Sequence, residues 1–296
     1  MDYHISGLVE FDMVYYEQNA ASFGLKIGHP DFKIVHQQTT EFQGILIAET
    51  QKYGRALFLD GVIQSTEADE GIYHDMLVHP VMAHVKAARK ILVAGAGEGA
   101  SLRELLKHSS VEHIDAVEID GGMIRAAKEH LPSWHKGAFA DDRVTVLEAD
   151  IFDHLETTGS DAYDGIIVDL TDPIDADGEF CADSLIFNKD FLKLLQTALK
   201  PGGCMVVQAG ERLSALGQVL PLLKRQFSWV QPYSVFVPSF YGNWTFLLLA
   251  DEDKSSPQRG IEAALTAQES LSCGYFSRLA YLHAAEQADR FFTAAE

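Results

Sequence analysis

The chain has 296 residues, of which 47% are hydrophobic, so it is long enough for one large core or two unequal domains. It has 43 acidic and 23 basic side chains, and the resulting charge of −20 disfavours nucleic acid and anionic membranes and favours polycations. The 3 cysteines lie far apart, the start at Met1 lacks the features of a signal peptide, and no apolar stretch is long enough to span a bilayer. We therefore expect a cytoplasmic protein with no nucleic-acid or membrane partner.

Residues 1 to about 70 predict short β-strands. Their side chains alternate between apolar and polar or are β-branched, and glycine-containing turns separate them. The expected strands are Ile34–Thr40, Gly44–Thr50 and Arg55–Leu59, with turns at Lys52–Gly54 and Asp60–Gly61. A helix is expected to follow, from Asp69 to about Ala88.

From Lys90 onward the pattern changes to strands that alternate with helices. The expected elements are Lys90–Ala94, Ser101–His108, His113–Ile119, Gly122–His130, Val144–Leu147, Gly165–Val168, Asn188–Leu199 and Cys204–Gln208. Lys200–Gly203 is predicted to end the helix before the last of these strands. Trp229–Val237 and Trp244–Leu249 are predicted to form a closing antiparallel pair of strands. We expect Asp251–Gly260 to be a loose polar segment and Ile261–Glu296 to form terminal helices. The alternation predicts an α/β fold with a Rossmann-like, doubly wound sheet.

A glycine-rich loop follows the first strand of this region. Gly95, Gly97 and Gly99 come directly after an apolar run, and such a loop normally aims backbone N–H groups at an anion. Here Glu98 places a negative charge where that anion would lie. Two unit charges about 4 Å apart at an effective dielectric of about 20 interact by roughly 4 kcal/mol. The sequence therefore predicts a ligand that is cationic near the loop.

Acids after the next two strands describe an adenosine site. Glu118 is the expected acceptor for the ribose hydroxyls, whereas Asp120 is expected to cap the following helix. Asp150 can accept the adenine amino group, and Ile151 can pack on the ring. A dehydrogenase would bring a pyrophosphate to the loop and a methyltransferase the carboxylate of S-adenosylmethionine, and Glu98 opposes both. Decarboxylated S-adenosylmethionine has an ammonium and a sulfonium and no carboxylate, so it gains from Glu98.

Two further acids, Asp169 and Asp172, end the fourth strand of the expected parallel sheet, at the edge where substrates bind. Two carboxylates are costly to gather unless a cation joins them. Asp172 could instead cap a turn before Pro173, or the pair could hold a metal. No cluster rich in histidine or carboxylates accompanies the pair, and the five-residue spacing of His74, His79 and His84 does not match a zinc-binding helix face. We therefore expect a cationic substrate and no metal.

Several ordered motifs together resemble a known family. They are Glu41–Ile47, Leu59–Glu70 running into Tyr73-His74-Asp75, the glycine loop with Arg103, Glu104 and His108, Glu118–Asp120 and Asp169–Pro173. Over nearly its full length the chain resembles the polyamine aminopropyltransferases, the spermidine and spermine synthases. The resemblance implies an N-terminal β-domain over residues 1–70, a Rossmann-like, class I methyltransferase-like catalytic domain over residues 71–296, and a homodimer or homotetramer.

The resemblance also implies a reaction and its residues. The aminopropyl group of decarboxylated S-adenosylmethionine, a co-substrate, would move to a polyamine with release of methylthioadenosine, and no further cofactor is expected. Asp169 would be the catalytic acid–base residue. The residues expected at the donor are Gln43, Gly95, Gly97, Glu98, Glu118, Ile119, Asp150 and Ile151, and those at the acceptor are Gln64, Tyr73, His74, Asp172 and Tyr241.

The acceptor amine is expected to be spermidine, which would give spermine or thermospermine. Typical spermidine synthases have a Pro-Thr-Tyr segment whose tyrosine touches the amine, and here that position is Phe240, followed by Tyr241. Glu98 in place of aspartate, Asp169–Ile174 and Gln208–Gly210 also resemble the spermine and thermospermine synthases. The alternatives are a spermidine synthase that uses putrescine, a class I methyltransferase and a non-catalytic polyamine-binding homologue.

Overall fold

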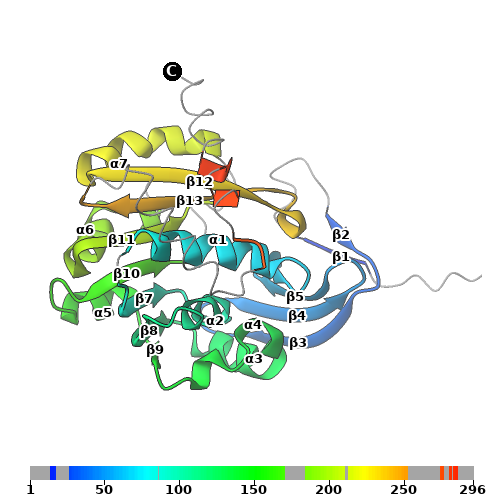
Figure 1. The fold of residues 1–296 in the computed structure, drawn as a ribbon. Helices are drawn as coiled ribbons and strands as arrows, with labels where there is room; N and C mark the ends of the chain where they lie inside the picture. Colours follow the sequence, from blue (N-terminus) through cyan, green and yellow to red (C-terminus); the bar gives the residue numbers. More distant parts are fainter. Residues whose placement is uncertain are drawn as a thin grey trace, which may run out of the picture.

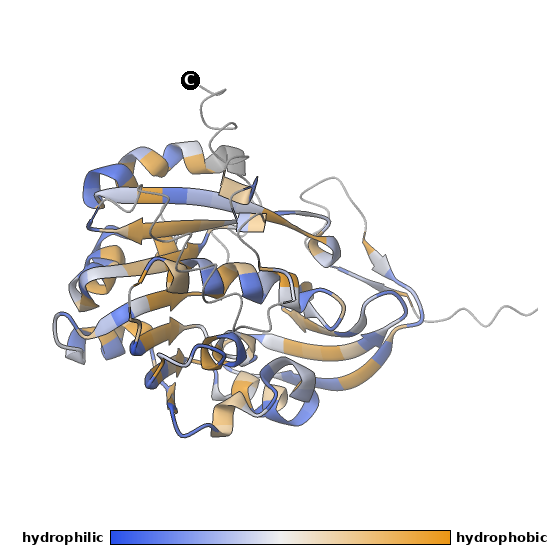
Figure 2. Cartoon of the chain, viewed as in Figure 1, coloured by the Kyte–Doolittle hydropathy of each residue, from blue (hydrophilic) through white to orange (hydrophobic). Residues whose placement is uncertain are grey.

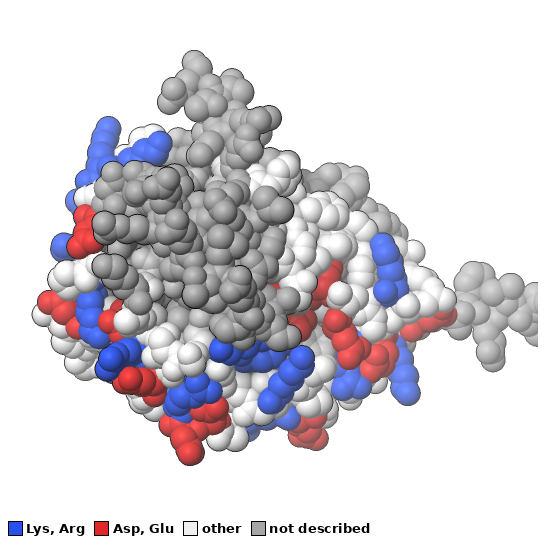
Figure 3. Space-filling view, in the orientation of Figure 1, with Lys and Arg blue, Asp and Glu red and all other residues white. Residues whose placement is uncertain are grey.

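The computed structural model describes residues 14–17, 27–85, 87–170, 184–210, 213–252, 274–276, 280–281 and 283–285. These residues form a large central sheet with helices on both of its faces and a smaller antiparallel sheet beside it (Figure 1). Within this part of the chain, no helix has the length and apolar character needed to cross a membrane. Among the described residues on the face drawn in Figure 3, acidic and basic side chains lie next to one another.

The central sheet has the strand order β12-β13-β11-β10-β7-β8-β9. Its strands are β7 (Lys90–Ala94), β8 (His113–Glu118), β9 (Val144–Glu148), β10 (Tyr163–Val168), β11 (Leu199–Gln208), β12 (Trp229–Val237) and β13 (Gly242–Ala250). Strands β7 to β11 pair in parallel, whereas β12 and β13 form the predicted antiparallel pair at one edge. The predicted α/β class with a mostly parallel, doubly wound sheet is confirmed.

Helices cover both faces of the sheet because the strands are apolar on both sides. Ile91 and Val93 of β7 pack into the core beneath α1 (Glu70–Ala83) and α2 (Ala100–Leu106). The alternate residues Leu92 and Ala94 pack into the core beneath α5 (Ile151–Thr157), α6 (Lys189–Ala198) and α7 (Leu220–Gln226). The apolar strands stand out in Figure 2, and α1 lies against the middle of the sheet in Figure 1.

The smaller sheet consists of successive antiparallel hairpins. It contains β3 (Lys33–Thr39), β4 (Gly44–Thr50), β5 (Gly54–Leu59) and β6 (Val62–Thr66), while β1 (Tyr15–Tyr16) pairs with β2 (Gly28–His29). Ile45, Ile47 and Leu57 on one face pack with Trp134 against α3 (Gly121–His130) and α4 (Pro132–His135). The indole N–H of Trp134 donates to the Ser65 hydroxyl oxygen at 2.7 Å, which joins α4 to β6.

Some predicted boundaries are wrong. The expected helix to about Ala88 ends at Ala83, with His84 as its C-cap. Lys200–Gly203 is not a break between helix and strand, because β11 begins at Leu199 and absorbs these residues in a register shift. Pro201 lacks an N–H and Gly202 has a φ of 79°, so the irregularity falls where regular pairing is hardest. Most of the loose segment and terminal helices predicted after Asp251 lies outside the described residues.

Strands β7 and β10 are neighbours in the middle of the sheet, and chain connections leave them in opposite directions. Ligands of open α/β sheets bind at such a switch point, beyond the carboxyl ends of the strands. Gly95 follows β7 there with a φ of 86°, and a Cβ atom on it would overlap the carbonyl oxygen of Asp169, which follows β10. The Asp169 N–H donates to the carbonyl of Ala94 at 2.8 Å. The glycine therefore allows the loop and Asp169 to share one small space.

We predict that Gly95→Ala destabilises the fold by at least about 2 kcal/mol more than Gly137→Ala does. Both glycines have a φ of 86°, but a Cβ on Gly137 would meet no atom within 4 Å, so it controls for left-handed backbone strain alone. Urea unfolding of both variants measures the difference. Equal losses would mean that the Asp169 carbonyl moves aside without cost.

Candidate active site

Asp169 is held by a tyrosine from the neighbouring helix. The hydroxyl of Tyr73, on α1, donates to Asp169 Oδ1 at 2.5 Å. Asp169 keeps some exposure at the surface, but burial of its carboxyl group raises its pKa to about 6, against the opposing effects of His74 and the Tyr73 hydrogen bond. An acid with a pKa this close to neutrality can exchange a proton with a substrate under ordinary conditions.

His74 lies between two glutamates. Its Nδ1 is 2.8 Å from the backbone carbonyl oxygen of Glu70 and 3.0 Å from Glu70 Oε2, and its Nε2 is 2.6 Å from Glu98 Oε1. A carbonyl oxygen only accepts, so Nδ1 must hold a hydrogen, and the Glu98 carboxylate calls for a second one on Nε2. Burial by itself lowers the pKa of His74, but Glu98 and Glu70 together raise it well above its usual value. The ring is therefore an imidazolium that partly neutralises Glu98.

Arg103 of α2 extends this arrangement into a chain of alternating charges. Its two terminal nitrogens lie 2.8 and 2.9 Å from the carboxylate oxygens of Glu70, and its Nε lies 2.7 Å from Glu104 Oε1. Burial would raise the pKa of Glu70, but hydrogen bonds from His74 and Arg103 outweigh it and lower that pKa to about 2. Each buried charge thus has an opposite neighbour, which offsets the loss of water.

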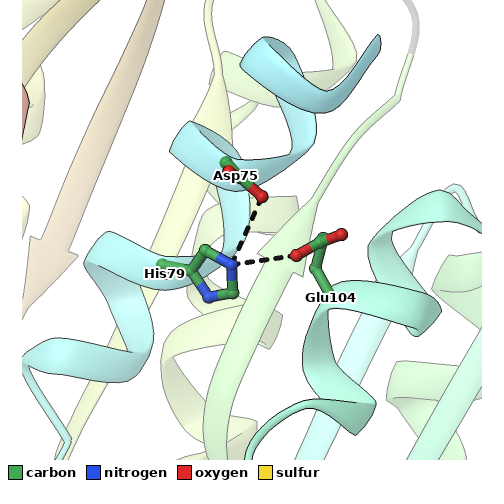
Figure 4. A group of neighbouring side chains, drawn as sticks. All are labelled: Asp75, His79 and Glu104. Carbon is green, nitrogen blue, oxygen red and sulfur yellow. Dashed lines mark hydrogen bonds and ion pairs between the residues drawn. The ribbon is translucent and has the colours of Figure 1, made fainter. Parts of the chain in front are cut away.

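A second buried group adjoins this chain (Figure 4). One ligand-type atom from each of Asp75, His79 and Glu104 lies within 4.8 Å of the other two, and His79 Nε2 is 2.9 Å from Glu104 and 3.5 Å from Asp75. The ammonium of Lys107 lies 2.5 Å from Glu104 Oε2, so a side chain already supplies the cation. His74 and His79 face different carboxylates, as their spacing predicts. The expected lack of a metal stays a prediction.

The carboxyl group predicted to bind ribose lies beside the glycine loop. Glu118 Oε1 accepts from the Asp120 N–H at 2.9 Å, and a Cβ on Gly97 would stand 3.2 Å from Glu118 Oε2. Burial raises the pKa of Glu118. Ile119, the next residue, is 44% exposed, which leaves an apolar side chain uncovered at the strand end.

The other residues predicted at the donor form part of the local structure. Asp150 caps α5 by accepting from the Phe152 N–H at 2.7 Å, and Ile151 is buried in the core. Asp120 caps α3, as expected, and its second oxygen accepts from the Gln43 amide at 2.8 Å. Gln43 is thereby held close to the end of β8, the strand that leads to Glu118.

On the expected acceptor side, the ring of Tyr73 lies beside two other aromatic rings, those of Phe240 and Trp244. The ring of Tyr73 lies 6.1 Å from that of Phe240 and 6.3 Å from that of Trp244, and those two rings are 4.8 Å apart. Phe240 belongs to η5 (Pro238–Phe240), the short turn before β13.

Tyr241 and Gln64 do not join this group. Tyr241 has a φ of 55°, is 42% exposed and faces Tyr53 and Lys52, whereas Phe240 and Trp244 are the residues beside Tyr73. The Gln64 side chain is exposed on β6, with its amide 3.5 Å from the Val62 carbonyl. Asp172 lies outside the described residues.

Comparisons with known proteins identify the family of this chain. Residues 70–259 match the spermine/spermidine synthase domain, and residues 32–67 match the spermidine synthase tetramerisation domain. The chain belongs to the polyamine aminopropyltransferase family. A polyamine aminopropyltransferase of Synechococcus sp. (strain JA-2-3B'a(2-13)) is 41% identical over 234 residues, which are 76% of this chain and 73% of the relative. One from Hyperthermus butylicus is 38% identical over 250 residues, 79% of this chain and 84% of the relative.

Solved structures of this family share the fold. The crystal structure of spermidine synthase from Thermotoga maritima aligns with a TM-score of 0.81 at 23% identity, covering 96% of this chain and 94% of the other. A spermidine synthase in complex with the transition state analogue AdoDATO aligns with a TM-score of 0.83 at the same identity and coverage. The expectation that this chain is an enzyme of the aminopropyltransferase class is confirmed.

Sequence reasoning did not assign functions to Glu70 and Arg103. The four-residue spacing from Glu70 to His74 was a usable signal, because residues four apart share one face of a helix. Arg103 stood in a recognised motif, but nothing in its sequence position indicates that its guanidinium reaches Glu70 on another helix.

Proposed function

We propose that this enzyme transfers the aminopropyl group of decarboxylated S-adenosylmethionine to a polyamine, preferably spermidine, and releases methylthioadenosine. The hydrogen bond between Tyr73 and Asp169 at the switch point is the main support for this proposal. It fixes a carboxyl group with a near-neutral pKa close enough to Glu98 for the two to interact electrostatically, and both groups attract cations. The sulfonium and ammonium of the donor carry the matching charges.

The donor is proposed to lie along the carboxyl ends of β7, β8 and β9. Glu118, beside Gly97, would accept the ribose hydroxyls, and the exposed Ile119 would pack against the nucleoside. Asp150 and Ile151 would bind the adenine, and Gln43 would contact the donor from the smaller sheet. Glu98 would bind the ammonium of the aminopropyl group, and Gly95 and Gly97, which have no side chains, would leave room for the methylene groups of the donor.

The reaction is proposed to be an in-line displacement. The acceptor nitrogen attacks the aminopropyl carbon bonded to sulfur, the C–S bond breaks, and the sulfur leaves as neutral methylthioadenosine. An alkylammonium with a pKa near 10.4 must first lose a proton, which costs roughly 4–5 kcal/mol at neutral pH. Asp169, oriented by Tyr73, positions the neutral amine and, as the N–C bond forms, accepts the proton that the newly alkylated nitrogen must lose.

Spermidine is the proposed acceptor. The rings of Tyr73, Phe240 and Trp244 offer an apolar wall for a chain of methylene groups, and Phe240 brings no hydroxyl to that wall. His74 and, in the residues beyond the described part, Asp172 would complete the acceptor side, with Gln64 and Tyr241 at its margin. Putrescine is the alternative acceptor.

We further propose that the enzyme is a homodimer or homotetramer in the cytoplasm. The match of residues 32–67 to a tetramerisation domain supports the assembly, and the separated cysteines support a reducing compartment.

The test of the function is a product analysis. Incubation with the decarboxylated donor and spermidine should yield a tetraamine together with one methylthioadenosine per transfer, whereas putrescine or agmatine should react more slowly. Chromatography of the amines against standards identifies the product. Efficient triamine formation from putrescine alone would replace the proposed acceptor, and the absence of any product amine would remove the function.

Asp169→Asn should lower turnover by roughly 10²–10⁴-fold and leave donor affinity nearly unchanged, because an amide cannot accept the amine proton. In the native enzyme, kcat/KM should fall as the pH drops through about 6, since the raised pKa of Asp169 means that its carboxylate is lost below that value. The Asp169→Asn variant should not show this decrease in kcat/KM near pH 6. Asp190→Asn, an exposed acid on α6, is the matched control. Unchanged turnover in Asp169→Asn would contradict the role.

Glu98→Gln should weaken binding of the decarboxylated donor by roughly ten- to a hundredfold, because it loses a hydrogen bond between charged groups. Binding of S-adenosylmethionine should weaken less or improve, since its carboxylate is repelled by Glu98. Calorimetric titration with both ligands gives the ratio, and Glu129→Gln, whose side chain is 77% exposed, serves as control. Equal losses for the two ligands would count against a charge-selective loop.

A further inference from the structure

The His74 imidazolium and the cationic end of the donor compete for the same carboxylate. His74 Nε2 is 2.6 Å from Glu98 Oε1, whereas the Glu98 side chain keeps 18% of its exposure toward solvent. Under the proposed function the donor ammonium also comes to Glu98, so two positive charges would meet on one carboxylate. Like charges this close disfavour each other's charged form.

Of the two cations, only His74 can become neutral at moderate pH. A simple alkylammonium stays charged up to a pH near 10, and the donor sulfonium has no proton to lose. The imidazolium can release its Nε2 proton and remain hydrogen-bonded through Nδ1 to the backbone carbonyl of Glu70 at 2.8 Å. The neutral ring would therefore keep its place in the helix.

We propose that binding of the decarboxylated donor displaces one proton from His74, so that the protonated histidine acts as a removable counter-ion for Glu98. This inference rests on the proposed function. The Nε2–H bond breaks, the proton passes to solvent, and the donor ammonium takes the place of that proton at Glu98. His74 is thus a positioning residue that sets the charge of the donor site before the donor arrives.

The charged groups around His74 agree with this assignment. Glu70 on the same helix and Glu98 from the loop contact the ring, and Asp169 at the end of β10 interacts with it electrostatically. Arg103 of α2 binds both carboxylate oxygens of Glu70, including the Oε2 that His74 contacts, and so limits how strongly Glu70 can hold the His74 proton. Glu98 and Glu70 together outweigh burial and keep His74 protonated in the free enzyme, as its raised pKa indicates.

The experiment measures proton release on donor binding at about pH 8, where Asp169 is already ionised and His74 is the group left to titrate. The decarboxylated donor is titrated calorimetrically in buffers of different ionisation enthalpy, without acceptor. About one proton should be released per donor bound, and donor affinity should rise about tenfold per pH unit while His74 is protonated in the free enzyme. Methylthioadenosine, which lacks the aminopropyl group, should release close to none.

His74→Gln keeps a hydrogen-bonding side chain without a titrating proton, so its proton release should fall to near zero. His113→Gln is the matched control: His113 also pairs with a carboxylate, Asp115 at 2.9 Å, but at the amino end of the sheet, and its release should equal the native value. Glu98→Gln gives a second readout, independent of whether His74→Gln folds. Removal of the carboxylate should lower both the protonation of His74 in the free enzyme and the release.

Two results would overturn the inference: donor binding without proton release in the native enzyme, or release that persists in His74→Gln. Product formation is assayed separately. If the donor binds and product amine forms without proton release, only this inference fails. If no donor binds and no product forms, the proposed function fails with it.

Discussion

A buried chain of alternating charges determines where the reactive side chains lie. Glu98, His74, Glu70 and Arg103 follow one another through contacts of 2.6–3.0 Å. Removing one member of such a chain would leave a buried charge unpaired, which typically costs about 3–5 kcal/mol. Because the chain joins the first turns of α1 to the glycine loop and to α2, it fixes the orientation of α1 and, with it, the direction in which Tyr73 points toward Asp169.

The same chain of charges changes the net charge expected at the glycine loop. From sequence alone, Glu98 appears as an uncompensated negative charge, but the His74 imidazolium already neutralises part of it. Attraction for a cationic donor therefore depends on the sum of Glu98, His74 and Asp169 and not on one carboxylate. Two acids against one imidazolium still leave a net negative charge at the site, so we still expect it to favour cations, but less strongly than Glu98 alone would.

Patterns within one segment predicted the fold well. The apolar run of β7 and its glycines determined a strand and a turn, and Asp120 before a helix was correctly expected to cap it. Contacts between distant segments were beyond such patterns. Gln43 and Asp120 are 77 positions apart, and the sequence gives no measure of their proximity. Tyr241 was expected at the acceptor, but its ring faces Tyr53 and Lys52, a contact that no pattern within its own segment indicates.

Helix α1 also connects the proposed donor side to the proposed acceptor side. Asp69, just before the helix, is buried and accepts from the N–H and hydroxyl of Ser239 at 2.6 and 2.9 Å. These bonds hold the turn that carries Phe240 against the ring of Tyr73. The residues proposed to face the acceptor and those proposed to face the donor are thus both positioned by one helix, α1. In-line displacement requires the attacking nitrogen, the carbon and the leaving sulfur to be aligned, and a single helix that positions both sides meets that requirement with few moving parts.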